Sequence, residues 1–217
     1  MIYWFSADLH LGHANIIKYC GRTIFMTQNE LAIYNEVKNL GREEQKKLKI
    51  SVESLRLMDE ELIKRWNERV KSEDIVFFIG DFCFRNSPGG KEGEGTLIKA
   101  KEYESKLNGK FIFIKGNHDR NNSCKTIIER LVINYGGKRV NLTHNPEHAD
   151  LNYEFNFCGH VHQHWKFKRI KTHYGFTNII NVGVDVNDFQ PKTFEELMSQ
   201  YNKWKKTLNL EKENEKN

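Results

Sequence analysis

Five short apolar stretches recur along the chain, and polar residues follow each of them. They are rich in Ile, Val and Phe and are bounded by Gly, Asn or Asp, a pattern typical of buried strands. The stretch at residues 75–79 is apolar throughout rather than alternating, which favours a strand covered on both faces. The predicted strands are residues 2–5, 75–79, 111–114, 140–142 and 155–158.

Helical patterns lie between these strands. Apolar residues at near-helical spacing, with charged residues between them, predict a helix over residues 55–70. Residues 97–107 form a second candidate, and Thr193 to Glu196 form a capping box that begins a helix running to about Lys206. Strands that alternate with helices indicate an α/β fold.

Part of the sheet structure is expected to be antiparallel, because Tyr135-Gly136-Gly137-Lys138 is typical of a hairpin turn. Residues 179–182 and 184–186 supply further predicted strands. Residues 28–49 are highly charged and fit no strand, so we expect an inserted helical segment on the surface. This segment is either an ordinary solvated helix or a cap that contacts the substrate.

The length of 217 residues favours a single domain, which we place at residues 1–206. The charged residues 207–217 carry few apolar anchors and are expected to form a flexible tail. With 38% hydrophobic and 29% charged residues, the composition is that of a globular protein. The apolar stretches are far shorter than the roughly 20 residues that a membrane helix needs, and the N-terminus does not resemble a signal peptide.

We therefore expect a cytoplasmic protein. Its four cysteines form no CxxC pair and are expected to be buried thiols rather than disulfides. The formal net charge of +5 suits nucleic acid or another phosphorylated ligand, and it suits a solvated surface with surplus lysine equally well.

The polar residues that follow the strands carry the candidate chemistry. In open α/β sheets, ligands bind beyond the carboxyl ends of the strands. Asp8 and His10 lie two positions apart, so an extended chain points both to the same side, and His160 and His162 repeat this spacing. Carboxylate, imidazole and carboxamide groups together are the ligand set of a dinuclear hydrolytic metal site.

Taken in order, these residues resemble the signature of the calcineurin-like metallophosphoesterases. All five blocks of that signature are complete, and two further stretches resemble small bacterial and phage members: Asp8 to His13, and Asn181 to Asp185. The five blocks are Asp8-Leu9-His10, Gly80-Asp81, Gly116-Asn117-His118-Asp119, His144 and Gly159-His160-Val161-His162.

The resemblance implies a four-layer αββα sandwich of two mixed β-sheets flanked by helices. It also implies two divalent metal ions, with Mn²⁺ as first choice and Fe, Zn²⁺, Ni²⁺ or Mg²⁺ as alternatives. One ion would be held by Asp8, His10 and His162. The other would be held by Asn117, His144 and His160, with Asp81 bridging the two.

The resemblance makes His118 a catalytic residue that protonates the leaving oxygen or stabilises developing charge. Asp119 would orient His118 or cap the following helix. Protein Ser/Thr phosphatases of the family carry an aspartate where this chain has Phe84, which argues against that branch. Arg85, His13 and His164 are candidates for substrate contacts.

We expect a hydrolase in which a hydroxide bridging the two ions attacks a phosphate ester, without a covalent enzyme intermediate. A phosphodiester is favoured because of the mild basic charge, the missing phosphatase aspartate and the resemblance to small members that often act on diesters. A phosphomonoester of a nucleotide or small metabolite is the alternative. The substrate could be a nucleotide or nucleic acid, and neither a membrane nor an obligate protein partner is indicated.

Two non-enzymatic classes fit less well. A non-catalytic scaffold on this fold would be expected to have lost ligands, whereas this chain keeps all of them and His118. A nucleic-acid-binding module with a structural metal would be expected to show a stripe of Lys or Arg interleaved with aromatic residues, and the sequence has none.

Overall fold

The computed structural model describes residues 1–84, 98–119, 124–173 and 175–214, which fold into two mixed β-sheets and helices. The first sheet has the strand order β3-β2-β1-β9, with β1, β2 and β3 parallel and β9 antiparallel to β1. Its strands are β1 (Tyr3–Ser6), β2 (Ile75–Ile79), β3 (Lys110–Ile114) and β9 (Lys192–Thr193).

The second sheet has the order β4-β5-β6-β8-β7, with β5, β6 and β8 parallel and an antiparallel strand at each edge. Gly136 and Gly137 have positive φ angles of 59° and 72° in the predicted hairpin turn, which joins β4 to β5. The strands are β4 (Arg130–Tyr135), β5 (Lys138–Thr143), β6 (Phe155–Cys158), β7 (Phe167–Thr172) and β8 (Gly175–Asn181).

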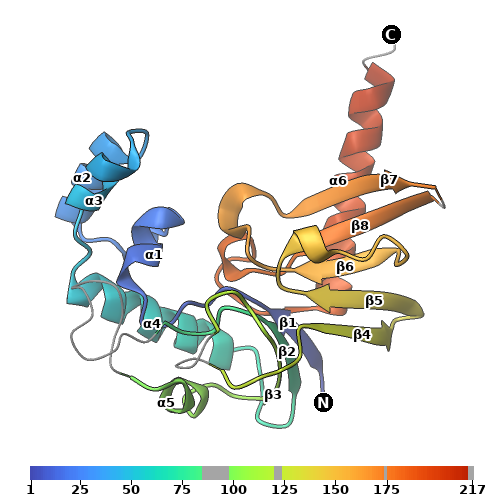
Figure 1. Cartoon of the computed structure of the whole chain (residues 1–217), viewed down its shortest axis with the longest axis horizontal. Helices are drawn as coiled ribbons and strands as arrows, with labels where there is room; N and C mark the ends of the chain where they lie inside the picture. Colours follow the sequence, from blue (N-terminus) through green and yellow to red (C-terminus); the bar gives the residue numbers. More distant parts are fainter. Residues whose placement is uncertain (85–97, 120–123, 174, 215–217) are drawn as a thin grey trace.

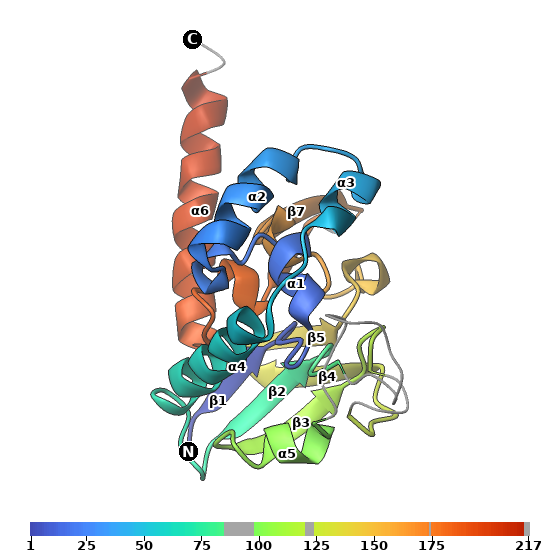
Figure 2. The same cartoon turned by 90° about the vertical axis from the view of Figure 1, so that its left-hand side faces the viewer.

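Helices flank the two sheets (Figures 1 and 2). The α-helices are α1 (Ala14–Tyr19), α2 (Gln28–Val37), α3 (Arg42–Lys47), α4 (Val52–Asn67), α5 (Ala100–Glu104) and α6 (Phe194–Asn214). The described part of the chain also contains short 3-10 helices, which are η1 (Thr23–Phe25), η2 (Pro146–His148), η3 (His162–His164) and η4 (Val184–Val186). The predicted fold class, α/β with two mixed sheets and flanking helices, is confirmed.

Both faces of the first sheet are buried, as the continuous apolar run of β2 predicted. Val76 and Phe78 pack in one apolar cluster with Met58, Leu62 and Trp66 of α4, which runs alongside β1 in Figure 2. The intervening residues of β2 belong to a second cluster, between the two sheets, which includes Phe5, Phe77, Ile114, Val140, Leu142, Phe157 and Ile180.

Helix α6 lies behind β7 and β8 in Figure 1. Its Phe194, Leu197 and Tyr201 join the cluster between the sheets, and Tyr201 also contacts the rings of Phe155 and Phe167. The predicted capping box is present, because the Thr193 backbone N–H donates to Glu196 and the Glu196 N–H donates to the Thr193 hydroxyl. The helix continues to Asn214, well past the predicted end near Lys206.

The charged segment at residues 28–49 is helical, as predicted, and forms α2 and α3. It is anchored to the start of α4 through Glu30, whose carboxylate accepts hydrogen bonds from the Ser51 backbone N–H and the Ser54 hydroxyl. Thr27 and Glu30 also form a capping box at the start of α2.

Some elements differ from the sequence-based expectation. The predicted strand at residues 184–186 is wrong, because these residues form η4, where the chain turns after β8. Edge strand β7, in which Phe167 and Ile170 stand among Lys and Arg residues, and the six-residue helix α1 were not predicted. In the described part of the chain, no helix has both the length and the apolar character needed to cross a membrane.

Substituting Phe157 tests the packing between the sheets. Its fully buried ring meets the ring of Phe5 edge-on at 5.0 Å. Phe157→Ala should lower the free energy of unfolding by about 3–5 kcal/mol, because it leaves a cavity where the sheets meet. Urea denaturation would measure the loss, with Ile127→Ala at a 96% exposed position as the control, expected to change stability by less than about 0.5 kcal/mol.

Candidate metal centre

The carboxyl ends of five parallel strands converge where the two sheets meet. Strands β1, β2 and β3 bring Asp8, His10, Asp81, Asn117 and His118 from the first sheet. Strands β5 and β6 bring His144, His160 and His162 from the second. The structure therefore places every predicted metal ligand at the same edge of the fold.

The backbone at this edge is unusual. Five of the predicted ligands have left-handed φ angles between 44° and 71°, a region that residues other than glycine rarely adopt: Asp8, His10, Asp81, His160 and His162. Such conformations cost energy and persist where the surrounding structure enforces them, most often at functional sites. Here they turn each side chain back over the end of its strand.

Two glycines make the close approach of the loops feasible. Gly80 has a φ of 85°, and a Cβ atom at this position would overlap the ring of His144. A Cβ atom on Gly116 would overlap the carboxylate and backbone nitrogen of Asp81. Both positions require glycine because a ligand side chain fills the space beside them.

One group of side chains that could hold an ion comprises Asp8, His10 and His162. Their potential ligand atoms all lie within 4.8 Å of one another. The His160 backbone N–H donates to both carboxylate oxygens of Asp8, at 3.1 and 2.9 Å, and so orients this carboxylate. These residues match the predicted ligand set of the first ion.

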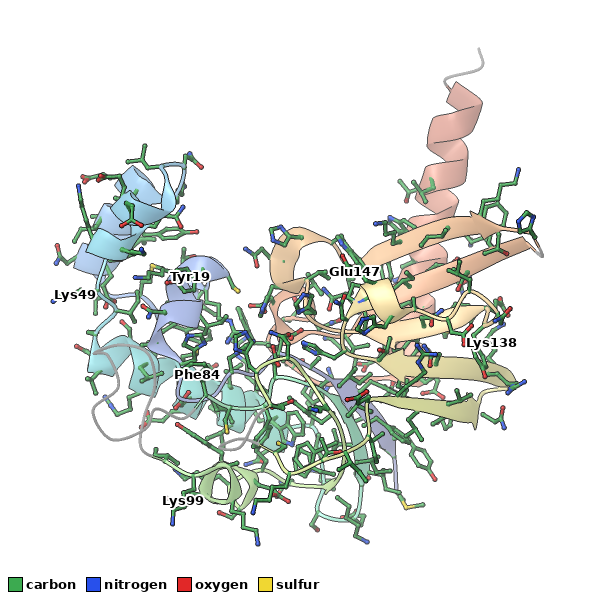
Figure 3. All side chains as sticks on the ribbon, in the orientation of Figure 1. Tyr19, Lys49, Phe84, Lys99, Lys138 and Glu147 are labelled. Carbon is green, nitrogen blue, oxygen red and sulfur yellow. The ribbon has the colours of Figure 1, made fainter. Side chains whose placement is uncertain are left out.

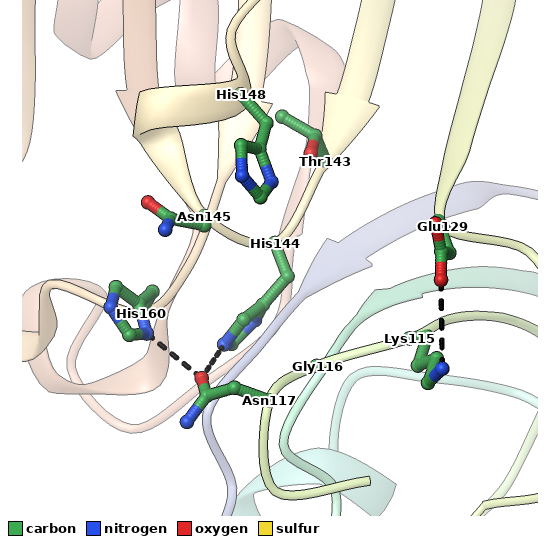
Figure 4. A pocket seen from close by; sticks show the side chains of 9 residues that line it. All are labelled: Lys115, Gly116, Asn117, Glu129, Thr143, His144, Asn145, His148 and His160. Carbon is green, nitrogen blue, oxygen red and sulfur yellow. Dashed lines mark hydrogen bonds and ion pairs between the residues drawn. The ribbon is translucent and has the colours of Figure 1, made fainter.

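The predicted ligands of the second ion also meet. The Asn117 side-chain oxygen lies 2.9 Å from His144 Nε2 and 2.9 Å from His160 Nδ1 (Figure 4). Asp81 Oδ2 lies 3.3 Å from His144 Nε2 and 3.4 Å from His10 Nε2, so this carboxylate touches both groups, as a bridging ligand would. Asp8 approaches His144 as well, at 4.0 Å.

The residues fit a divalent cation. His10 is 1% exposed, yet neither of its ring nitrogens has a hydrogen-bond partner among the described residues. Burying an imidazole in this way is costly unless another group, such as a metal ion, takes the lone pair. The ligand atoms are oxygen and nitrogen, which suit Mn²⁺, Fe and Zn²⁺.

The Asp119 side chain bonds to the backbone of two loops. Its carboxylate accepts hydrogen bonds from the backbone N–H groups of Asp81, Phe82 and Gly116, at 2.7, 3.1 and 2.9 Å. It therefore ties the loop after β2 to the loop after β3. His118, by contrast, is exposed, and its ring centroid lies 5.3 Å from that of His10.

The three candidates for substrate contact differ in their position relative to the centre. His13 lies beside the centre, with its ring stacked on Phe84 at 4.3 Å and 6.5 Å from the ring of His118 (Phe84 is labelled in Figure 3). His164 is exposed on η3. Among the described residues, it has no contact with the Asp81 carboxylate. Arg85 lies outside the described residues.

A pocket of about 240 Å³ adjoins the second group of ligands (Figure 4). Besides Asn117, His144 and His160, its lining includes Lys115, Asn145 and His148. The centre is therefore open on this side to a ligand from solvent.

Sequence reasoning gave no functional role to two residues that contact the predicted ligands or their neighbours, although Asp185 ends one of the stretches that carry the resemblance. Asp185, on η4 after β8, lies 2.8 Å from His162 Nδ1, and Arg22 forms an ion pair with Asp185 at 2.7 Å. Asp185 follows an apolar stretch as the other ligands do, so the same pattern could have found it. Arg22 lies in a loop, and no comparable pattern marks it.

Known proteins are similar to this chain in sequence or in fold. A family model described as the calcineurin-like phosphoesterase superfamily domain matches residues 59–194. The chain belongs to this superfamily. MJ1445, an uncharacterised protein of Methanocaldococcus jannaschii, is 31% identical over 210 residues that span 94% of each chain. The crystal structure of AQ665, a protein of unknown function from Aquifex aeolicus, covers 92% of this chain and 98% of its own, with a TM-score of 0.56 and 19% identity.

Membership of the superfamily and the Asp and His groups together support a metal-dependent phosphoesterase. The electrostatics of the phosphoesterase centre agree. Burial raises the pKa of Asp8 to about 6. Burial also opposes the charged forms of His144 and His162, but hydrogen bonds to Asp81 and Asp185 and the charge of Asp8 prevail, and raise the pKa values to about 9 and about 11. The centre thus attracts positive charge.

These pKa values predict that metal binding releases protons. In the metal-free protein His144 and His162 are protonated at neutral pH, whereas a metal ligand must be deprotonated. The affinity for Mn²⁺ should therefore rise with pH, by about tenfold per pH unit for each proton displaced. Isothermal titration calorimetry in buffers of different ionisation enthalpy would count the protons. An affinity that stays constant from about pH 6 to about pH 8 would contradict the prediction.

Proposed function

We propose that this phosphoesterase binds two divalent ions, with Mn²⁺ as the first choice, and hydrolyses phosphate esters, with a preference for phosphodiesters. The observation that carries the proposal is the contact of one buried carboxylate oxygen, Asp81 Oδ2, with imidazoles of both ligand groups. A carboxylate shared in this way is what a pair of adjacent ions requires.

When bound, two divalent ions lower the pKa of water, which provides a nucleophile near neutral pH, and they neutralise charge on the phosphate. The protein side chains hold the ions and orient the ligands. Asp8 and Asp81, both buried, supply the negative charge that holds the ions. The Asp8 carboxylate is fixed by the His160 N–H, and Oδ1 of Asp81 accepts a 2.9 Å hydrogen bond from the His118 N–H.

The position of His118 supports a role at the leaving group. It is exposed and lies next to His10 without belonging to either ligand group, so its ring can reach a bound substrate. Donation of a proton to the leaving oxygen is the role that this position supports.

The surroundings of His118 support the preference for diesters. Phe84 occupies the position of the phosphatase aspartate and contacts both His13 and His118, with ring centroids 4.3 and 5.9 Å apart. An aromatic wall packs favourably against an uncharged organic substituent. A phosphodiester carries one more such substituent than a monoester.

Metal reconstitution tests the proposed activity. Protein stripped of metal should be inactive, and activity should return with Mn²⁺ or another of the named divalent ions, with bis-p-nitrophenyl phosphate turned over faster than p-nitrophenyl phosphate. Release of p-nitrophenol measures both rates. Faster turnover of the monoester would reverse the substrate preference, and hydrolysis of neither with any ion would overturn the proposed function.

His118→Ala tests the role of this histidine. The variant should keep both ions and lose about 10²–10⁴-fold in kcat, because it removes the proton donor and no metal ligand. His173→Ala, at an exposed position in the turn after β7, serves as the matched control and should leave kcat unchanged. Loss of a metal ion in His118→Ala, measured by elemental analysis, would show instead that His118 is a ligand.

A further inference from the structure

Arg22 is a fully buried arginine in the loop between α1 and η1, with 1% of its surface exposed. Its guanidinium donates from Nε and Nη2 to the two carboxylate oxygens of Asp185, at 2.7 and 3.1 Å. The same group donates from Nη2 to the backbone oxygen of Asp8, at 2.7 Å, and from Nη1 to that of Leu9, at 2.9 Å. One side chain thus joins η4 to the loop after β1.

The geometry of Asp185 determines which nitrogen of His162 is available. Asp185 Oδ2 lies 2.8 Å from His162 Nδ1, and a carboxylate can only accept, so Nδ1 carries the proton. In the neutral ring, Nε2 then carries the lone pair. A carboxylate that holds a histidine in this way fixes the ring and its tautomer for metal binding.

Arg22 acts on Asp8 in a similar way. The carbonyl groups of Asp8 and Leu9 that it binds belong to the turn in which Asp8 has a φ of 60° and His10 a φ of 51°. Two charge-assisted hydrogen bonds offset part of the cost of this left-handed backbone. This backbone conformation directs the side chains of Asp8 and His10 toward the candidate metal centre.

We propose that Arg22 and Asp185 are positioning residues for one of the two ions, the one held by Asp8, His10 and His162. This inference rests on the proposed function, because it presumes that two ions bind. The other ion is affected less, since its predicted ligands Asn117, His144 and His160 do not contact the Arg22–Asp185 pair. Loss of the pair should weaken the binding of the ion held by Asp8, His10 and His162 and leave the binding of the other largely unchanged.

Lysine cannot replace Arg22 in this role. A lysine ammonium is a point charge on a flexible stem and cannot bond to both Asp185 oxygens and two backbone carbonyls in one planar arrangement. The role of Arg22 therefore depends on its shape as well as on its charge.

Calorimetric titration of the metal-free protein with Mn²⁺ tests the inference. Wild type should bind two ions, whereas Asp185→Asn, Asp185→Ala and Arg22→Lys should each weaken one of them by about 10–100-fold and leave the other within about twofold. Asp185→Asn keeps the shape of the side chain, and circular dichroism and thermal unfolding would verify that the variant is folded.

Asp74→Asn is the matched control for loss of a buried carboxylate. Asp74 is 1% exposed and accepts a 3.0 Å hydrogen bond from the ring nitrogen of Trp4, at the opposite end of the sheet. This variant should lose stability while binding both ions as wild type does. A merely structural role for Arg22 and Asp185 would give the same result in their variants.

Cys20→Ser separates positioning from direct coordination. Cys20, His162 and Asp185 have potential ligand atoms within 4.8 Å of one another, so Asp185 could bind an ion itself with help from the thiol. Retention of both ions in Cys20→Ser supports positioning, and loss of one ion overturns it. The inference would also be overturned if Asp185→Asn and Asp185→Ala bound two ions with unchanged affinity. If the wild-type protein bound fewer than two ions, the proposed function would be refuted instead.

Discussion

The burial of two carboxylates side by side is the constraint on which the rest of the structure depends. Asp8 and Asp81 are 0% and 1% exposed, at the point where the two sheets meet. Buried charges of like sign are costly unless cations and hydrogen-bond donors compensate them. Backbone N–H groups and the protonated imidazoles of His144 and His162 provide this compensation in the metal-free protein, and a divalent cation held there would replace the protons.

This requirement explains the strained backbone. Side chains at the end of a strand normally point along or across the sheet, whereas the ligands must point back over it toward a common point. Left-handed φ angles at Asp8, Asp81 and His160 achieve this, and Asp119 holds two of the loops through three backbone N–H groups. The rigidity of the centre therefore comes from residues that would not touch a substrate.

Most of the centre could be predicted from the sequence, because each predicted ligand closely follows an apolar stretch. A residue that follows a strand in the sequence also lies at the end of that strand in the folded protein. Strands β2 and β6 have the predicted bounds for the same reason. Arg22 could not be predicted, because its partners Asp8 and Asp185 are distant in sequence and meet only through the tertiary fold. Helix α1 was missed because six residues are too few to show a helical period.

The origin of the ligands links metal binding to the docking of the sheets. The first sheet supplies Asp8 and Asp81, and the second supplies His144 and His162, so an ion held by these residues would bridge two sheets that also meet through apolar packing. An ion that binds only the folded state adds about 2.7 kcal/mol to its stability at a free concentration 100 times Kd. That gain is comparable to the burial of a large apolar side chain. A metal ion bound there would help to hold the sheets together, and Arg22 already joins the loop after β1 to η4 after β8 through its bonds to Asp8 and Asp185.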